Sequence, residues 1–353
     1  MADITPKMNV YEIDPTTDER WEDFLQNHPQ ASIFHTRGWL EALRRTYGYT
    51  PVAFTTSPPG CPLSNGLPFC KVTGWSGRRR LVALPFSDHC APLVESQEQL
   101  TYLLGYLRAK LAGERWSYVQ IRANEAGVAD PSGCDTRDTL VLHELDLRPT
   151  LDNIFRSFHP SCVQRKIKRA EREKLEYKEG QSEALLTAFY RLLQVTRRRH
   201  GVPPQPFEWF QNLTACLGDA VKVRVAYKGG LPIAGVVTLR YKQTMMYKYG
   251  SSAPESTALG GMQFLLWSAI QEAKKDSIPV LDMGRTDVEN QGLVLFKDRW
   301  GTTRTILRYF QYPAQRVNNK LEALQLRVIK GLCSHAPIGL LAAAGKVLYK
   351  YAG

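Results

Sequence analysis

Cysteine is scarce in this sequence, and its placement argues against two kinds of site. The seven cysteines are scattered from Cys61 to Cys333, with no Cys-x-x-Cys pair and no histidine at ligand spacing. We therefore expect no metal site. An odd number of scattered cysteines is typical of reduced packing residues in a cytoplasmic protein, not of a disulfide framework.

Long apolar runs are also missing. No stretch reaches the roughly 18 apolar residues that a membrane-spanning helix requires. The N-terminus, Met1–Asp14, has neither a basic n-region nor an apolar h-region, so we expect no secretory signal. With 43% hydrophobic residues and ordinary glycine and proline counts, the 353 residues indicate a folded chain of two or three domains.

Acidic residues are few in the second half of the chain. Residues 1–148 hold 15 Lys and Arg against 18 Asp and Glu, whereas residues 149–353 hold 31 against 16. A basic half favours an anionic partner such as RNA, a phosphate-bearing nucleotide or an acidic lipid headgroup. A solvated basic surface with no partner also accounts for many such proteins.

The second half has a regular predicted order of elements. Residues 231–240 and 243–251 predict a hairpin, and residues 262–275 carry apolar side chains at helical spacing. Strands are expected over 279–284 and 304–312. This order resembles the GNAT acyltransferase fold, whose loop between strand and helix presents backbone N–H groups to an anionic donor. The candidate donor contacts are Ser251, Ser252, Gly260 and Gly261.

The first half repeats this order. Leu84–Leu93 (LPFSDHCAPL) precedes one long predicted helix, as Tyr247–Glu255 (YKYGSSAPE) precedes the other. The repeat predicts an α/β architecture of two tandem GNAT-like domains followed by a helical tail. The expected ranges are 1–148 and 149–312 for the domains and 313–353 for C-terminal amphipathic helices.

Two basic helices are predicted near the start of the second half, over 159–174 and 182–200. The first carries Arg165, Lys166, Lys168, Arg169 and Arg172 and has only a narrow apolar face. The second ends in three arginines and His200, where the helix dipole favours positive charge. A solvated face explains both runs as well as an anion-binding surface does.

Six short motifs carry a family resemblance. They are Ser32–Trp39 (SIFHTRGW), Leu84–Leu93 (LPFSDHCAPL), Arg165–Leu175 (RKIKRAEREKL), Thr196–Gly201 (TRRRHG), Asp282–Arg285 (DMGR) and Phe296–Gly301 (FKDRWG). In this order and spacing, over residues 9–312, they resemble the Fem-type aminoacyltransferases, which build peptidoglycan interpeptide bridges with two tandem GNAT domains. The chain is most similar to shorter FemAB-like or BioF2-like relatives, including those linked to exosortase and exopolysaccharide systems.

The resemblance implies transfer of an aminoacyl or acyl group onto an amine without a covalent enzyme intermediate. It implies no firm cofactor, with aminoacyl-tRNA or acyl-CoA as the donor substrate and a phosphate-bearing envelope precursor as the acceptor. The pair Gly260-Gly261 lacks the full pyrophosphate signature of CoA-binding GNAT enzymes. Only 20 residues separate His200 from Val221, so the long helical arm of some Fem enzymes is missing and a tRNA would meet the basic face alone.

Three positions match residues of the family. Lys297 matches a lysine at the substrate phosphate and transfer centre, and Arg199 matches the arginine of a Thr-x-x-Arg pattern. Arg44 lies five residues after Trp39, whereas the family's lysine lies four after its tryptophan, so this match is shifted by one residue. We expect Lys297 to point outward into a cleft between the domains, with Arg285 and Arg199 beside it.

The base that accepts the amine proton has several candidates. Asp88 and His89 form an Asp–His neighbourhood that could work near neutral pH, although a turn-forming aspartate is as good an explanation. Asp282 lies on an otherwise apolar strand and needs a partner, for which Arg285 is the expected one. His200 could act as the base or simply end its helix.

The tail predicts two amphipathic helices, over 317–332 and 337–351. They either pack on the second domain or contact anionic lipid, which would suit a lipid-linked acceptor and a cytoplasmic protein at the inner face of the membrane.

Three functions are open on this basis. The first is an amide-forming transferase of peptidoglycan or exopolysaccharide precursors. The second is an acyl-CoA-dependent N-acyltransferase of a small amine or amino sugar. The third is a non-catalytic RNA- or lipid-binding module on a GNAT scaffold. We expect no DNA partner.

Overall fold

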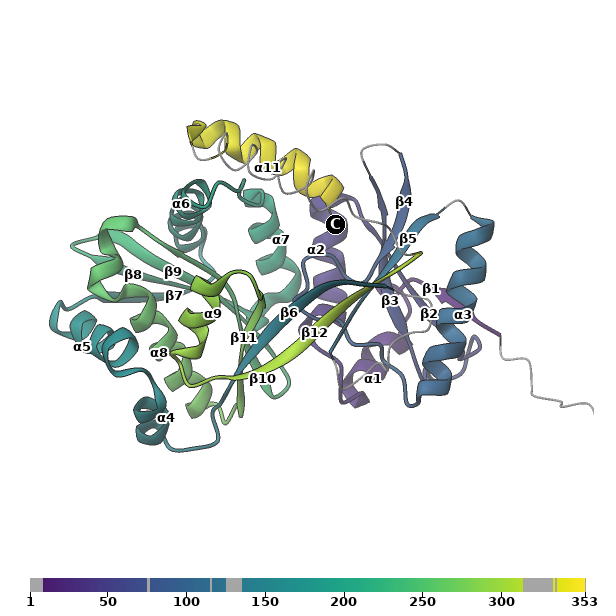
Figure 1. The fold of residues 1–353 in the computed structure, drawn as a ribbon, viewed down its shortest axis with the longest axis horizontal. Helices are drawn as coiled ribbons and strands as arrows, with labels where there is room; N and C mark the ends of the chain where they lie inside the picture. Colours follow the sequence, from purple (N-terminus) through teal and green to yellow (C-terminus); the bar gives the residue numbers. More distant parts are fainter. Residues whose placement is uncertain are drawn as a thin grey trace, which may run out of the picture. The chain divides into compact units, whose positions relative to one another are not determined.

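The computed structural model describes residues 9–74, 77–114, 116–124, 135–313, 333 and 335–352. The chain forms two compact units (Figure 1). Unit 1 consists of residues 1–139, 307–315 and 351–353, and unit 2 consists of residues 140–306 and 316–350.

Unit 1 is a mixed sheet with helices. Its strands lie in the order β1-β2-β3-β4-β5-β12, and every neighbouring pair is antiparallel except β4 and β5, which are parallel. The strands are β1 (Tyr11–Ile13), β2 (Thr50–Thr55), β3 (Leu67–Thr73), β4 (Arg79–Val82), β5 (Trp116–Asn124) and β12 (Thr303–Tyr312). The helices are α1 (Arg20–Asn27), the short η1 (Ile33–His35), α2 (Arg37–Tyr47) and α3 (Gln97–Gly113).

Unit 2 has the same plan. Its strands lie in the order β7-β8-β9-β10-β11-β6, antiparallel except for the parallel pair β10 and β11. The strands are β6 (Asp135–Asp146), β7 (Glu176–Gly180), β8 (Val221–Lys228), β9 (Leu231–Tyr241), β10 (Thr244–Ser252) and β11 (Val280–Asp287). The helices are α4 (Leu151–Ser157), the π-helix η2 (Pro160–Gln164), α5 (Arg165–Arg172), α6 (Glu183–Arg199), α7 (Phe207–Leu217), η3 (Gly218–Ala220), η4 (Pro254–Leu259), α8 (Gly261–Lys275) and α9 (Gln291–Asp298).

The two sheets match strand for strand, which confirms the tandem GNAT-like architecture. In both, three antiparallel pairs are followed by one parallel and one antiparallel pair. The sixth strand is exchanged, because residues 140–146 of β6 pair in unit 2 and residues 307–312 of β12 pair in unit 1. The units therefore differ from the expected ranges over 140–148 and 307–312. The predicted domain ranges, 1–148 and 149–312, therefore stay a prediction.

Local sequence explains where the helix α2 begins and ends. The Thr36 hydroxyl caps its first turn by accepting from the Trp39 backbone N–H, 3.4 Å away. Gly48 ends it in the left-handed conformation, with φ of 71°. Trp39, Leu40 and Leu43 are fully buried on one face.

Some elements were not expected. The basic helix predicted over 159–174 begins as η2 and becomes α-helical only at Arg165. No helix was expected over α9, because Leu293 and Leu295 are exposed on it and blur the apolar periodicity. Its N-terminus is instead marked by Asn290, whose side chain accepts from the Leu293 N–H at 3.2 Å.

The C-terminal helix α11 (Ile338–Ala352) confirms the helix expected over 337–351. The helix expected over 317–332 lies outside the described residues. Within the part of the chain that the structure describes, no helix is both long and apolar enough to cross a membrane.

Candidate active site

Unit 2 contains a pocket at the place where β10 and β11 part. The two parallel strands are paired only from Thr244–Val280 to Met246–Asp282, although β10 continues to Ser252. A pocket of about 480 Å³ is lined by the far half of β10 and by β9, η2, α5, α6, α8 and α9. Parallel strands that separate in this way leave room for a ligand between neighbouring elements.

The pocket has a strongly one-sided charge. Its lining includes four cations, Arg165, Lys166, Arg199 and Arg299, and no acidic residue among the described ones. The three arginines are exposed, while Lys166 is half-buried and donates to the Thr257 carbonyl oxygen at 3.2 Å. Such a lining favours an anionic ligand, because no described acidic side chain in the pocket offsets the positive charge of the cations.

The first turn of α8 adds backbone donors to this pocket. No side chain caps the helix, and its N-cap is Gly260, with φ of 79°. A Cβ at Gly260 would overlap the carbonyl oxygen of Lys166, so only glycine lets α5 approach the start of α8 this closely. The helix therefore presents uncapped N–H groups and the positive end of its dipole to the pocket.

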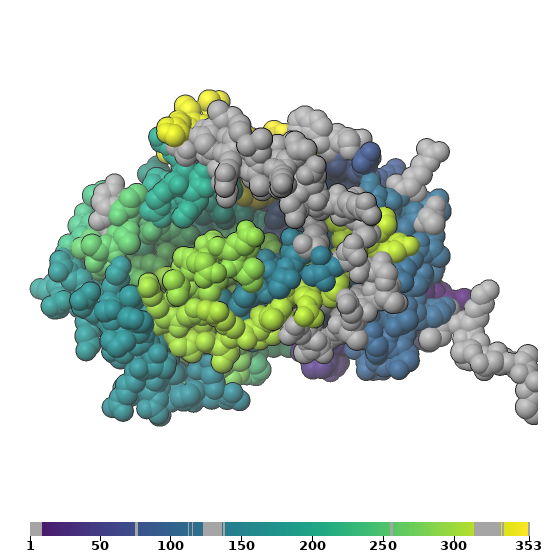
Figure 2. Space-filling model, viewed as in Figure 1, coloured from purple at the N-terminus to yellow at the C-terminus, as the bar shows by residue number. Residues whose placement is uncertain are grey.

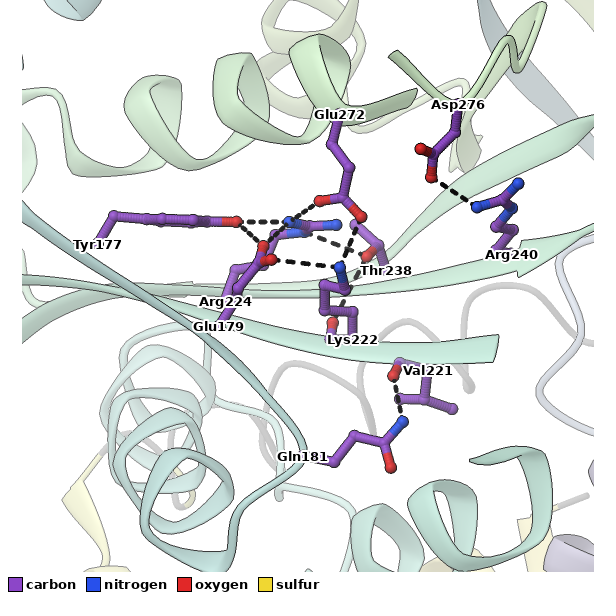
Figure 3. A network of polar contacts seen from close by, with 10 residues as sticks. All are labelled: Tyr177, Glu179, Gln181, Val221, Lys222, Arg224, Thr238, Arg240, Glu272 and Asp276. Atoms are coloured by element: carbon purple, nitrogen blue, oxygen red, sulfur yellow. Dashed lines mark hydrogen bonds and ion pairs between the residues drawn. The ribbon is translucent and has the colours of Figure 1, made fainter. Parts of the chain in front are cut away.

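A buried ionic network fixes α8 on the sheet. Figure 3 shows Glu272, near the end of α8, between Arg224 and Lys222 of β8. The Arg224 Nη1 donates to Glu272 at 2.7 Å and to Glu179 of β7 at 2.5 Å, and the Lys222 Nζ donates to Glu272 at 2.6 Å. Because the Arg224 side chain is 1% exposed, this network ties the helix firmly to β7 and β8. The N-terminus of α8 is thereby held in place at the pocket.

A second tie joins α6 to the end of β10. The Thr196 hydroxyl donates to the Ser252 carbonyl oxygen at 3.2 Å and accepts from the Ser252 N–H at 3.0 Å. Arg199 follows one turn later and lines the pocket, together with Ser251, Ser252 and Gly261. The structure thus brings these four expected residues to one pocket, while their roles as ligand contacts stay predictions.

Comparison with known proteins agrees with this geometry. Residues 161–291 match the acetyltransferase (GNAT) domain family. The chain is 25% identical over 271 residues to a UDP-N-acetylmuramoylpentapeptide-lysine N(6)-alanyltransferase from Weissella viridescens, an alignment that covers 69% of this chain and 77% of that protein. The crystal structure of FemX has the same fold, with a TM-score of 0.67 at 14% identity over 90% of this chain and all of that one. The chain is thus similar to FemAB-like tandem GNAT acyltransferases in sequence and in fold.

Other solved structures share the fold of this chain. A tandem GNAT protein from the clavulanic acid biosynthesis pathway superposes with a TM-score of 0.52 at 10% identity, over 88% of this chain and 99% of that one. The C-terminal domain of a putative lysylphosphatidylglycerol synthetase from Agrobacterium fabrum superposes with a TM-score of 0.55 at 14% identity, over 88% of this chain and 95% of that one.

Lys297 does not point outward, contrary to the expectation. It lies in α9 and is 3% exposed. Its Nζ donates to the carbonyl oxygens of Gly284 at 2.7 Å and Arg285 at 2.9 Å. The cause is an irregularity of β11 between Asp282 and Arg285, which turns these carbonyls toward α9. Lys297 and Arg285 are not among the lining residues described for the pocket, so the expected three-cation site with Arg199 is not formed there.

The cation that does reach the pocket from this motif is Arg299, two residues further on. The Phe296–Gly301 motif therefore located the site, while sequence reasoning singled out a different cation in it. Phe296, expected in the core, is half-buried and lines the pocket as well.

A buried histidine next to Lys297 had no signal in the sequence. His143 of β6 is fully buried, and its Nε2 lies 3.4 Å from a carboxylate oxygen of Asp298. Burial lowers the pKa of His143, the charge of Lys297 lowers it further, and Asp298 only partly offsets both. The imidazole is therefore neutral at pH 7, close to a cation held by backbone carbonyls.

Two other candidates for the base have structural roles in unit 2. Asp282 is 1% exposed, and its carboxylate accepts from the Gly284 N–H at 2.6 Å, which stabilises the irregular turn of β11. His200 is the exposed residue that ends α6, and burial together with the charges of Arg199 and Arg197 lowers its pKa.

The expected residues of the first half lie in unit 1. The Asp88 carbonyl oxygen accepts from the Tyr309 hydroxyl at 2.8 Å, and the His89 ring packs edge-on against Phe34. Trp39 is fully buried, so it belongs to the core and is not accessible to a substrate. Arg44 is bound by Asp14 at 2.6 Å.

Among its described residues, unit 1 contains a much smaller cavity. Between β3, β5, α3 and residues 90–92 lies an apolar cavity of only about 10 Å³. Within the described residues, the large cationic pocket is therefore a feature of unit 2.

Proposed function

We propose that this enzyme takes an aminoacyl or acyl group from an anionic donor bound in the unit 2 pocket and places it on an amine of a phosphate-bearing cell-envelope precursor. The observation that carries this proposal is the cationic pocket at the uncapped start of α8, which has four cations and no described acid. The relative from Weissella viridescens, named for alanyl transfer to a lysine of a UDP-linked muropeptide, supports the acceptor class.

The reaction needs three things from the protein. The acceptor amine must lose a proton, the donor carbonyl must be polarised, and both substrates must be held in line. In this proposal the α8 N-terminus and Arg165, Arg199 and Arg299 hold the donor phosphates, and Ser251 and Ser252 lie beside its acyl end. Lys297 acts from behind, since its ammonium fixes the carbonyls of β11 beside the reacting groups. Asp88 and His89 are proposed for the acceptor side, and Arg44 for its phosphate.

The donor decides between two versions of this function. An aminoacyl-tRNA donor fits the basic half of the chain, and an acyl-CoA donor would indicate an N-acyltransferase of a small amine or amino sugar. Either donor is cytoplasmic, so we place the enzyme there. A lipid-linked acceptor would bring it to the inner face of the membrane.

Transfer itself is the test. The purified chain is incubated with a labelled aminoacyl-tRNA or acetyl-CoA and with a UDP-linked muropeptide, and the amide product is detected by mass spectrometry. Arg199→Gln and Arg299→Gln should each raise the donor KM at least tenfold. Arg148→Gln is the matched control, because Arg148 is exposed and paired with Asp146 outside the pocket. The proposal would be contradicted if neither donor supported transfer, or if all three variants had the same donor KM.

A further inference from the structure

One face of the C-terminal helix α11 is docked on unit 2. Leu341 is 3% exposed, and the Tyr349 hydroxyl donates to the Pro203 carbonyl oxygen at 3.1 Å. A Cβ at Gly345 would overlap the Pro204 carbonyl oxygen, so the helix touches the backbone of this loop directly. These three positions follow each other at intervals of four residues and define the inner face of the helix.

The opposite face is apolar and exposed. Leu340 is 65% exposed, Val347 45% and Leu348 50%. Leu340 and Val347 are seven residues apart and lie along one stripe of the helix, and Leu348 flanks this stripe on the side of Leu341. Figure 2 shows that atoms of this yellow segment reach the surface at one edge of the molecule. The docked helix therefore leaves part of its apolar surface exposed to solvent.

The charged side chains of the helix itself have one sign. Residues 338–352 contain no aspartate or glutamate and two lysines, Lys346 and Lys350. Lys346 is anchored by Glu208 of α7 at 2.8 Å. Arg197, near the end of α6, lies close enough to Tyr349 to affect its pKa, which burial raises. An anionic surface is the complement of such an edge.

We propose that α11 rests on an anionic lipid bilayer, with Leu340, Val347 and Leu348 between the headgroups and Lys346 and Lys350 at the phosphates. A protein partner is disfavoured by area, because three aliphatic side chains are far less than the roughly 800 Å² per partner of a stable interface. A membrane needs no such area, since modest apolar burial and cation attraction add together. This contact goes beyond the transfer reaction and does not depend on which donor the enzyme uses.

Vesicle binding of the full chain tests this proposal. Co-sedimentation is measured with vesicles of phosphatidylcholine alone and with phosphatidylglycerol added. We expect binding to the anionic vesicles only, and weaker binding as salt rises. The double variant Leu340→Asp/Val347→Asp should bind at least tenfold more weakly, and Lys350→Gln about fivefold. Leu231→Asp is the matched control, because Leu231 is 70% exposed at the start of β9 and away from α11.

Three results would overturn the proposal. The first is unchanged vesicle binding in the double variant, or equal binding to neutral vesicles. The second is a dimer, measured by light scattering, that the double variant abolishes, since the face would then bind a second copy. The third is a melting temperature lowered by several degrees in the double variant alone, since the face would then be covered by another part of the same chain.

Discussion

Two backbone carbonyls bind the ammonium of Lys297, and they decide what its substitution does. Lys297→Met keeps the length of the side chain but leaves these buried acceptors without a donor, which costs about 1 to 3 kcal/mol of unfolding free energy. We expect transfer to fall by about a hundredfold or more as well, as when a preorganised donor is removed from an active site.

Urea unfolding and transfer rates are measured on the same preparation, so that lost folding is separated from lost catalysis. Lys274→Met is the control, because the Lys274 Nζ also donates to a carbonyl oxygen, that of Arg148 at 2.8 Å, but on the surface. Its effect should be within about 0.5 kcal/mol. Near-normal transfer by folded Lys297→Met would show that Lys297 has no role in the transfer reaction.

His143 predicts a loss of stability on mild acidification. The folded chain keeps this imidazole neutral, whereas the unfolded chain takes up a proton as the pH falls below about 6.5. Protons therefore favour the unfolded state. His143→Gln should show a smaller difference in unfolding free energy between pH 7.5 and pH 5.5 than the parent. An equal difference in both proteins would mean that His143 titrates alike whether the chain is folded or not.

For single residues, the sequence predicts which ones lie near a site better than it predicts how deeply each one is buried. Ser251, Ser252 and Gly261 could be expected at one donor site because their neighbours set local strands and helix ends, whereas Arg199, expected beside Lys297 and Arg285, lines the same pocket. The burial of Lys297 could not be foreseen, since it depends on carbonyls twelve and thirteen residues away that an irregular strand turns toward it. His143 carried no local signal at all.

Among the elements, α8 depends on its ionic tie to β8. Burial alone would raise the pKa of Glu272, but the hydrogen bonds from Arg224 and Lys222 bring it below its ordinary value. Glu272→Gln leaves the buried Arg224 short of one carboxylate and should destabilise the chain by about 3 kcal/mol. Because the folded-state pKa is lowered, this stabilisation is present above about pH 4.5 and is lost as the pH falls further.

Asp276→Asn is the matched control for this prediction. Asp276 also lies at the end of α8 and pairs with Arg240, as Figure 3 shows, but both side chains are largely solvated. Chemical unfolding should show an effect within about 0.5 kcal/mol for this variant. Similar losses in both variants would show that the tie to Arg224 adds nothing beyond a surface pair.

The long periodic helices of the chain were predictable, whereas its short elements were not. α2, α6 and α8 follow from caps and apolar spacing within their own residues. α9 did not, because it exposes part of its apolar side at the pocket rim. The exchange of β6 and β12 was equally hidden, since a strand's own pattern does not say which sheet it joins.

For the whole molecule, the excess of cations in the second half predicts how binding responds to salt. If the donor is a tRNA, the logarithm of its affinity should fall by about 0.7 to 0.9 per log unit of salt for each phosphate neutralised. Arg165→Gln removes one pocket cation and should reduce that slope by about one contact. Filter binding across salt concentrations measures it, with Arg148→Gln as the control. A flat response would remove tRNA from the donors.

The exchanged sixth strands also have a consequence for the time course of synthesis. Unit 1 starts before unit 2 in the chain, yet its sixth strand, residues 307–312, follows all the strands of unit 2. During synthesis β5 therefore stays unpaired along one side until the strands of unit 2 have been translated. Unit 2 receives β6 early and has its last strand when β11 emerges. The sheet that is made second is the first to have all of its strands.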